Sequence, residues 1–283
     1  MALPAHVEPL ERAWFYTYRA ICGLILFFLI APIIIIIPLS FNAGFYLSFT
    51  EKMLSLDPAG FSTQWYQEFF NDQKWIDGIK NSFFIAILSA MISTALGTLA
   101  ALGLSRPEMP FRKFFMALLI SPMIVPLIVS ALGMYFFLVS VGLGSTYTGI
   151  ILSHAVLGTP FVVITVTATL SGFDQSLIRA GLNLGAKPST VFFKIIMPLI
   201  LPGVISGALF AFITSFDEVV VINFVGTTEQ QTIPQVMFRG LRENISPTIL
   251  AVATILVGIS VALLVTMELL RRRSERLRGL SPA

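Results

Sequence analysis

The chain alternates long apolar stretches with short polar ones, and six apolar stretches are long enough to cross a bilayer. A membrane-spanning helix needs about 20 predominantly apolar residues, because each residue advances the helix by about 1.5 Å. The pattern predicts an all-α integral membrane protein with six transmembrane helices, over residues 20–39, 81–104, 114–141, 149–170, 199–221 and 249–270. The first apolar core is too long for a cleaved signal peptide, so we expect it to be retained.

These helices imply a single membrane domain over residues 20–270, between an N-terminal segment, residues 1–19, and a basic tail, residues 271–283. The long loop at residues 42–80 holds Trp65, Tyr66 and Trp75. Their amphipathic rings suit a membrane interface or a docked partner. The loop at residues 171–198 is rich in Gly and Ala and should lie on the opposite side of the membrane.

Composition agrees with a lipid environment. Charged residues make up 12% of the chain and hydrophobic residues 56%, with a mean hydropathy of +0.87. Soluble domains carry about 25% charged residues. So much apolar surface requires membrane lipid as a partner, and it argues against soluble enzymes and nucleic-acid binders.

The positive charges set the orientation, because cytoplasmic loops carry an excess of Lys and Arg. With six spans, 13 of the 18 basic residues fall on the side of the termini. They are Arg12, Arg19, Arg106, Arg112, Lys113, Arg179, Lys187, Lys194, Arg271, Arg272, Arg273, Arg276 and Arg278. Both termini are therefore predicted to be cytoplasmic.

Catalytic and metal-binding groups are scarce. Cys22 is the single cysteine, and His6 and His154 are the two histidines, so we expect no metal site and no cofactor held by this chain. His154 is expected to hydrogen-bond a neighbouring helix, since no second titratable group accompanies it in its span. The chain has no Gly-x-x-x-x-Gly-Lys-Ser/Thr phosphate loop and is predicted not to be an enzyme.

A short helix is predicted over residues 177–184 of the Gly-rich loop. Leu177, Ile178, Leu182 and Leu184 give it apolar positions, Gly185 is a natural stop, and the proline that follows prevents it from resuming. A cytoplasmic helix of this kind has no core of its own. It either lies among lipid headgroups or docks into a groove on another protein.

This loop resembles the signature of permease subunits of binding-protein-dependent ABC importers, which reads Glu-Ala-Ala, three residues, Gly, nine residues, then Ile-x-Leu-Pro. The matching positions are Arg179, Ala180, Gly181, Leu182, Gly185, Ala186, Pro188, Ile195, Met197 and Pro198. Arg179 and Gly181 depart from the family's Glu and Ala, which leaves any salt bridge of that glutamate in doubt.

The resemblance implies a coupling helix that docks in a groove of an ATP-binding subunit, expected in two copies that bind ATP and Mg. It also implies a second permease subunit, usually a different chain, an extracytoplasmic solute-binding protein, and a location in the bacterial inner membrane.

The second half resembles the spermidine/putrescine permease branch. The segments that carry this resemblance are Ser215-Phe216-Asp217-Glu218-Val219-Val220-Val221, Thr232-Ile233-Pro234 with Arg239, Pro247 leading into Ala251 and Thr254, and residues 112–126 with Pro122 and Pro126. The resemblance implies half of a translocation path for a polyamine. A related importer of an opine, an aminophosphonate or an amino-acid derivative is the alternative within the class, and a self-sufficient ion-coupled carrier or a membrane enzyme is the alternative outside it.

The predicted fifth span offers candidate residues for such a path. Gly203, Gly207, Ala211 and Ser215 recur every fourth residue and form a stripe along which another helix can pack closely. Asp217 lies about 200° around the helix from Ser215. Intramembrane carboxylates are costly and by default indicate a pathway or ion-binding role.

The candidates for the substrate path are therefore Asp217 and Glu218, with Phe210 and Tyr135 offering aromatic faces to a cation. Alternatively, the two acids only reach interfacial water or pair with Arg239 or Arg242.

Overall fold

The computed structural model describes residues 9–106, 108–172, 174, 176–243 and 245–277. The ends of the predicted N-terminal segment and basic tail, residues 1–8 and 278–283, lie outside the described residues. The described chain is nearly all helical, with one isolated antiparallel bridge between Asn42 and Phe61, which confirms the predicted all-α class. It divides into two compact units, one formed by residues up to Asp72 together with those from Gly240 onward, the other by Gln73–Arg239.

The Gln73–Arg239 unit holds the long helices that matter most for function. Its elements are α4 (Gln73–Leu104), α5 (Arg112–Ile124), α6 (Leu127–Ser140), α7 (Tyr147–Ser171), α8 (Ser176–Asn183), α9 (Pro188–Val191), the π-helical turn η2 (Phe192–Ile196), α10 (Met197–Phe216), α11 (Val220–Val225) and the 3₁₀ turn η3 (Thr228–Gln230). Helix α12 (Ile233–Glu243) crosses the boundary between the units.

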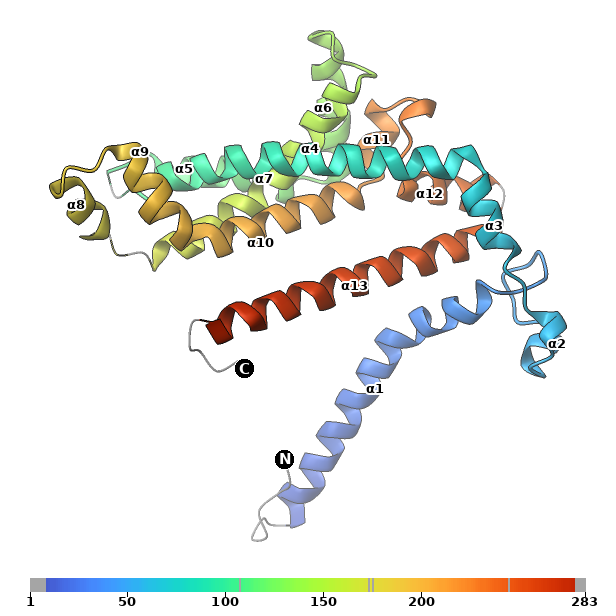
Figure 1. Cartoon of the computed structure of the whole chain (residues 1–283). Helices are drawn as coiled ribbons and strands as arrows, with labels where there is room; N and C mark the ends of the chain where they lie inside the picture. Colours follow the sequence, from blue (N-terminus) through green and yellow to red (C-terminus); the bar gives the residue numbers. More distant parts are fainter. Residues whose placement is uncertain (1–8, 107, 173, 175, 244, 278–283) are drawn as a thin grey trace. The chain divides into compact units, whose positions relative to one another are not determined.

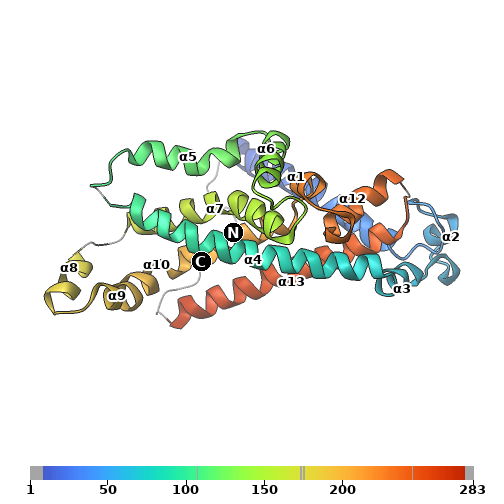
Figure 2. The ribbon, with the colours of Figure 1, turned by 90° about the horizontal axis from the view of Figure 1, so that it is seen from above.

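Helices α4, α7 and α10 lie side by side and form the centre of this unit (Figures 1 and 2). Val162 of α7 faces a glycine on each neighbour: a Cβ built on Gly97 would lie 2.6 Å from Val162 Cβ, and one built on Gly207 would lie 2.8 Å from Val162 Cα. Ser89 and Ser93 of α4 donate hydrogen bonds to carbonyls of α7, at 3.0 and 2.9 Å. Close approach at small residues and interhelical hydroxyl bonds are the usual means of helix association in membranes, and the predicted packing stripe on α10 is confirmed.

The predicted third span is not one continuous helix. The chain bends by 105° between α5 and α6, and Val125 adopts extended backbone angles (φ −68°, ψ 135°). Pro126 causes the break, because its ring disfavours helical angles for the residue before it and it has no N–H to donate. Pro122 lies inside α5 without ending it. Because proline has no N–H, it cannot bond the Leu118 carbonyl one turn earlier, and the Ser121 hydroxyl donates to that carbonyl instead (2.8 Å).

The predicted fifth span also ends early. We expected a helix to residue 221, but α10 ends at Phe216 and a separate helix begins at Val220. The Glu218 side chain, between the two helices, accepts hydrogen bonds from the first N–H groups of α11. These bonds stabilise the start of α11 and so favour a break over continuation of α10.

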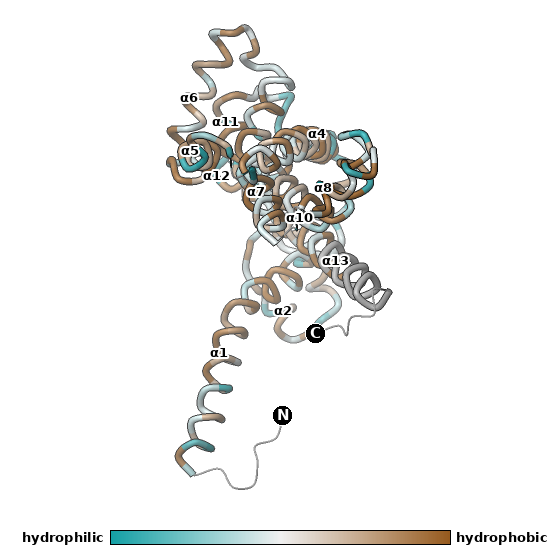
Figure 3. The backbone as a smooth tube through the Cα atoms, turned by 90° about the vertical axis from the view of Figure 1, so that its left-hand side faces the viewer, coloured by the Kyte–Doolittle hydropathy of each residue, from teal (hydrophilic) through white to brown (hydrophobic). Residues whose placement is uncertain are grey.

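The other unit contains α1 (Pro9–Leu39), α2 (Glu51–Leu54), the 3₁₀ turn η1 (Pro58–Gly60), α3 (Gln64–Asn71) and α13 (Thr248–Leu277). Helix α1 has no buried residue. Figure 3 shows apolar residues along most of its length. An apolar stretch of helix without a polar face suits a hydrophobic environment such as lipid.

The loop at residues 42–80 corrects one expectation. Trp65 and Trp75 are buried, and Trp65 Nε1 donates to the Asn42 carbonyl at 2.6 Å. These two rings therefore stabilise the fold and do not form a membrane-facing belt. Phe45 and Tyr46 are exposed instead, on a turn whose backbone is held by hydrogen bonds with the Asn42 side chain.

Within the described residues, four helices are long and apolar enough to span a membrane: α1, α4, α7, and the continuous run Pro188–Phe216 that includes α10. The bent pair α5 and α6 is a fifth candidate, and α13 offers the shorter apolar helix Thr248–Ala262. The count of six spans therefore remains a prediction.

Candidate translocation and coupling sites

Asp217 and Glu218, the two adjacent acidic residues at the elbow between α10 and α11, have different environments. Asp217 is the C-terminal cap of α10, where its N–H donates to the Ile213 carbonyl (3.0 Å) and its side chain is exposed. Glu218 is 5% exposed, and its carboxylate accepts from the N–H groups of Val220 (2.7 Å), Val221 (2.8 Å) and Ile222 (3.3 Å). These N–H groups have no partner within α11, so the carboxylate satisfies the start of the helix and complements its dipole.

His154 of α7 lies beside this elbow. Its Nδ1 is 2.8 Å from the Ser215 hydroxyl of α10, so the predicted hydrogen bond to a neighbouring helix is confirmed. The structure adds a titratable neighbour that the sequence did not place in the same span: His154 Nε2 lies 3.7 Å from Glu218 Oε2. The imidazole is fully buried.

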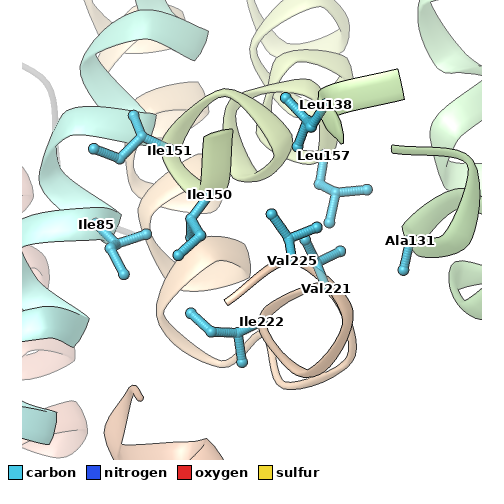
Figure 4. Close-up of a cluster of buried hydrophobic side chains, with 9 residues drawn as sticks. All are labelled: Ile85, Ala131, Leu138, Ile150, Ile151, Leu157, Val221, Ile222 and Val225. Carbon is cyan, nitrogen blue, oxygen red and sulfur yellow. The ribbon is translucent and has the colours of Figure 1, made fainter. Parts of the chain in front are cut away.

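Helix α11 is also fixed by apolar contacts. Val221, Ile222 and Val225 belong to a buried cluster with Ile150 and Leu157 of α7 (Figure 4). Members of this cluster also come from α4 and α6. Helix α11 is therefore held both by hydrogen bonds to Glu218 and by apolar contacts with the buried cluster.

The other two path candidates have different neighbours. Tyr135 of α6 is half-buried and packs against the cluster that holds α11. Phe210 of α10 is half-exposed and stacks on Phe161, with ring centroids 6.0 Å apart. Nothing in these contacts tests whether Asp217, Glu218, Phe210 and Tyr135 line a substrate path, and that role stays a prediction.

A polar cluster that the sequence did not reveal ties the segment after α11 to α4. Asn81 Nδ2 donates to the carbonyls of Glu229 (2.9 Å) and Gln231 (3.0 Å), and Tyr147 donates to Asn81 Oδ1 (2.9 Å). The Ile233 N–H donates to the Ser82 hydroxyl at 2.8 Å. The Asn81 and Ser82 bonds to the segment after α11 join residues about 150 apart in sequence, and the Tyr147 bond joins residues 66 apart, so no local pattern predicts such pairing.

The predicted loop helix is present as α8, from Ser176 to Asn183. At its start, Asp174 accepts from the Ser176 hydroxyl (2.6 Å) and N–H (2.8 Å), and these bonds hold the pKa of Asp174 below its usual value. At its end, Gly185 has φ +81°, and the N–H groups of Gly185 and Ala186 bond back to Leu182 and Gly181. Glycine is favoured in this left-handed conformation, so the predicted stop at Gly185 is confirmed.

Gly181 allows α8 to lie close to the segment that leads into α10. A Cβ at this position would lie 2.9 Å from Ile195 Cδ1 and 3.2 Å from Val191 Cγ2. Arg179, Ala180, Leu182, Leu184 and Gly185 are exposed, whereas Ala186 is partly buried and Pro188 begins α9. Ile195 lies in the π-helical turn and Pro198 in the first turn of α10, so the two halves of the motif are in contact through Gly181.

Within the described residues, no three His, Cys, Asp or Glu side chains are placed to hold a metal ion. The expectation that this chain holds no metal and no cofactor stays a prediction.

Residues 93–276 match the family model described as the inner membrane component of binding-protein-dependent transport systems. The chain belongs to this family. It is 32% identical over 261 residues to the spermidine/putrescine transport system permease protein PotC of Haemophilus influenzae, covering 92% of this chain and 98% of that protein. It is also 31% identical over 242 residues to the putrescine transport system permease protein PotI of Escherichia coli, covering 82% of each.

The fold agrees with this family. It is similar to a chain in the crystal structure of a bacterial ABC transporter involved in the import of the acidic polysaccharide alginate, with a TM-score of 0.71, 16% identity, and coverage of 95% of this chain and 99% of that chain. The resemblance predicted from the sequence, to importer permeases and to their polyamine branch, is confirmed. As a component of a transport system, the chain is a membrane permease subunit and not an enzyme.

Proposed function

We propose that this chain forms half of the translocation path of an ATP-driven importer for a polyamine such as spermidine or putrescine. The observation that carries the proposal is the similarity to the spermidine/putrescine permease PotC along 92% of this chain. A polyamine is a flexible polycation, so its path needs acidic and aromatic groups that attract it without holding it tightly.

The end of α10 offers such a group. Asp217 is an exposed carboxylate at a helix C-terminus, where the last backbone carbonyls also present partial negative charge. Both features favour a protonated amine. Phe210 and Tyr135 would add aromatic faces on the neighbouring surface of α10 and on α6.

Helix α8 is the proposed contact with an ATP-binding subunit. Leu177 and Leu182 of α8 are each 43% exposed and Leu184, which follows the helix, is 87% exposed, so these apolar side chains are left uncovered by the described residues. A groove on a partner would bury them, and the contact of Gly181 with Ile195 would carry the movement of α8 toward α10.

The complete assembly would contain two ATP-binding subunits that bind ATP and Mg, a second and different permease chain, and an extracytoplasmic solute-binding protein. Both termini of this chain would face the cytoplasm of a bacterial cell across its inner membrane, as the distribution of basic residues indicates.

Isolation of the tagged full chain from its native membranes in mild detergent tests this assembly. Mass spectrometry should identify an ATP-binding subunit, a second permease and a solute-binding protein. The recovered complex, placed in proteoliposomes, should take up radiolabelled spermidine when the binding protein is outside and ATP is inside. Uptake without ATP or partners would instead support an ion-coupled carrier. ATP-dependent uptake of an opine or an amino-acid derivative but not spermidine would replace the polyamine with that solute.

A further inference from the structure

The buried cluster of His154, Ser215 and Glu218 has a role that the substrate path does not explain. We propose that Glu218 and His154 are positioning residues: the carboxylate anchors the start of α11, and the imidazole braces that carboxylate, so that the elbow holds Asp217 at the surface. The link to Asp217 rests on the proposed function, whereas the anchoring of α11 does not.

The anchor itself follows from the hydrogen bonds of Glu218. Both carboxylate oxygens accept backbone N–H groups, Oε1 from Val220 and Oε2 from Val221 and Ile222. Bonds to an ionised acceptor are stronger than bonds between neutral groups. If the carboxylate were removed, the start of a six-residue helix would lose three acceptor contacts at once, in a place closed to water.

The brace is provided by His154 of α7. His154 Nδ1 is paired with Ser215. The other ring nitrogen, Nε2, is buried without a hydrogen bond to any described residue and lies 3.7 Å from Glu218 Oε2. In the tautomer with its proton on Nε2, Ser215 donates to Nδ1 and the Nε2 proton faces the carboxylate. At 3.7 Å this is an electrostatic contact and not yet a hydrogen bond, and a shift of the elbow by about 0.7 Å would complete the bond.

The burial of this pair distinguishes positioning from substrate contact. His154 is 0% exposed and Glu218 5% exposed, whereas the neighbouring Asp217 is exposed. A polyamine passing the elbow would meet Asp217 first. It would reach Glu218 only if the polar anchor of α11 opened.

Hydrogen exchange tests the anchor without reference to any substrate. In the full complex, amide exchange is measured by mass spectrometry on peptides that contain Val220 and Val221. The isosteric variant Glu218→Gln should speed exchange of these amides at least about tenfold, because the amide side chain offers one acceptor oxygen in place of two. Ser153→Ala is the matched control: this α7 hydroxyl is buried next to His154 in sequence and, among the described residues, bonds only the Gly149 carbonyl of its own helix, so exchange near α11 should not change.

A pair of histidine variants tests the brace. The amide of Asn extends about as far as Nδ1, and the amide of Gln about as far as Nε2. His154→Asn should keep the Ser215 bond but lose the brace, and it should speed exchange at Val220 and slow uptake. His154→Gln should restore a donor toward Glu218 and retain most of the protection and uptake.

Each outcome decides between the alternatives. Lost uptake in Glu218→Gln with unchanged exchange would overturn the positioning role and make Glu218 a substrate contact. Equal behaviour of the two histidine variants would overturn the brace. Faster exchange in Glu218→Gln, together with no spermidine uptake by the unmodified complex, would retain the anchor and reject the polyamine assignment alone.

Discussion

Replacing Gly207 with alanine tests the packing on which the central helices depend. A Cβ at this position would lie 2.5 Å from Thr165 Oγ1 and 2.8 Å from Val162 Cα. Both distances are shorter than van der Waals contact. The second neighbour is backbone of α7 and cannot rotate away, so α7 and α10 must separate.

The expected cost follows from these contacts. Inserting a methylene or methyl group into a well-packed core costs about 1–3 kcal/mol. The gain in helix propensity from Gly to Ala offsets up to about 1 kcal/mol of this. Thr165 cannot relieve the contact freely, because its hydroxyl donates to the Phe161 carbonyl at 2.9 Å. Because both contacts are shorter than 3.0 Å, the packing cost lies in the upper part of its range, about 2–3 kcal/mol, and we expect Gly207→Ala to lower the free energy of unfolding by about 1–2 kcal/mol.

The assay is unfolding of the full chain in mixed micelles of a mild detergent and SDS, followed by tryptophan fluorescence. Gly103→Ala is the matched control, because Gly103 also lies in a long helix of the same unit, near the end of α4, but a Cβ added there would have no atom of the described residues within 4 Å. That variant should be neutral or stabilised by up to about 1 kcal/mol. If Gly207→Ala proved as stable as Gly103→Ala, close approach of α7 and α10 at this residue would be refuted.

Three further substitutions address other parts of the chain. Asp217→Asn should reduce spermidine uptake by about tenfold or more with the complex intact, because a charge-assisted hydrogen bond is lost; normal uptake would remove Asp217 from the path. Gly185→Ala should destabilise the end of α8 by about 1–2 kcal/mol, since alanine is strained at φ +81°. This variant should also lower recovery of the ATP-binding subunit. The control Gly172→Ala, at φ −93° with open space around it, should have neither effect. Ser89→Ala should cost about 0.6–1.7 kcal/mol in the same unfolding assay, because the bond to the Ile151 carbonyl is lost; no change would show that this hydroxyl contributes nothing to the contact of α4 with α7.

The features predictable from sequence were those that depend on short-range patterns. Apolar length located the regions of the long helices, although α1 and α4 begin earlier than their apolar cores. The glycine stop after α8 and the small-residue face of α10 each depend on a few neighbouring residues, and both are confirmed. The break before Pro126 could have been predicted from the sequence, because proline disfavours helical backbone angles for the residue before it. Hydropathy over a long window does not register a single residue of this kind.

Features that depend on tertiary contacts were not predictable. Trp65 and Trp75 have the composition of an interfacial belt, yet both are buried, and the Trp65 indole donates to the Asn42 carbonyl. Asn81 begins the predicted second span, and in the structure it bonds carbonyls about 150 residues away. Side-chain chemistry shows that such groups need partners, and it does not identify the partners.

The adjacent acids at the elbow show why charge alone was insufficient. In a continuous helix, Asp217 and Glu218 would lie about 100° apart, and both would be candidates for the same path. The helix instead ends at Phe216, which leaves Asp217 exposed and turns Glu218 back onto the first N–H groups of α11. The cost of burying a carboxylate is then offset within the chain, by three backbone donors and a nearby imidazole. An intramembrane acid whose acceptor sites are mostly taken by backbone N–H groups has little left for a substrate, so the exposed Asp217 is the stronger candidate to meet a polyamine.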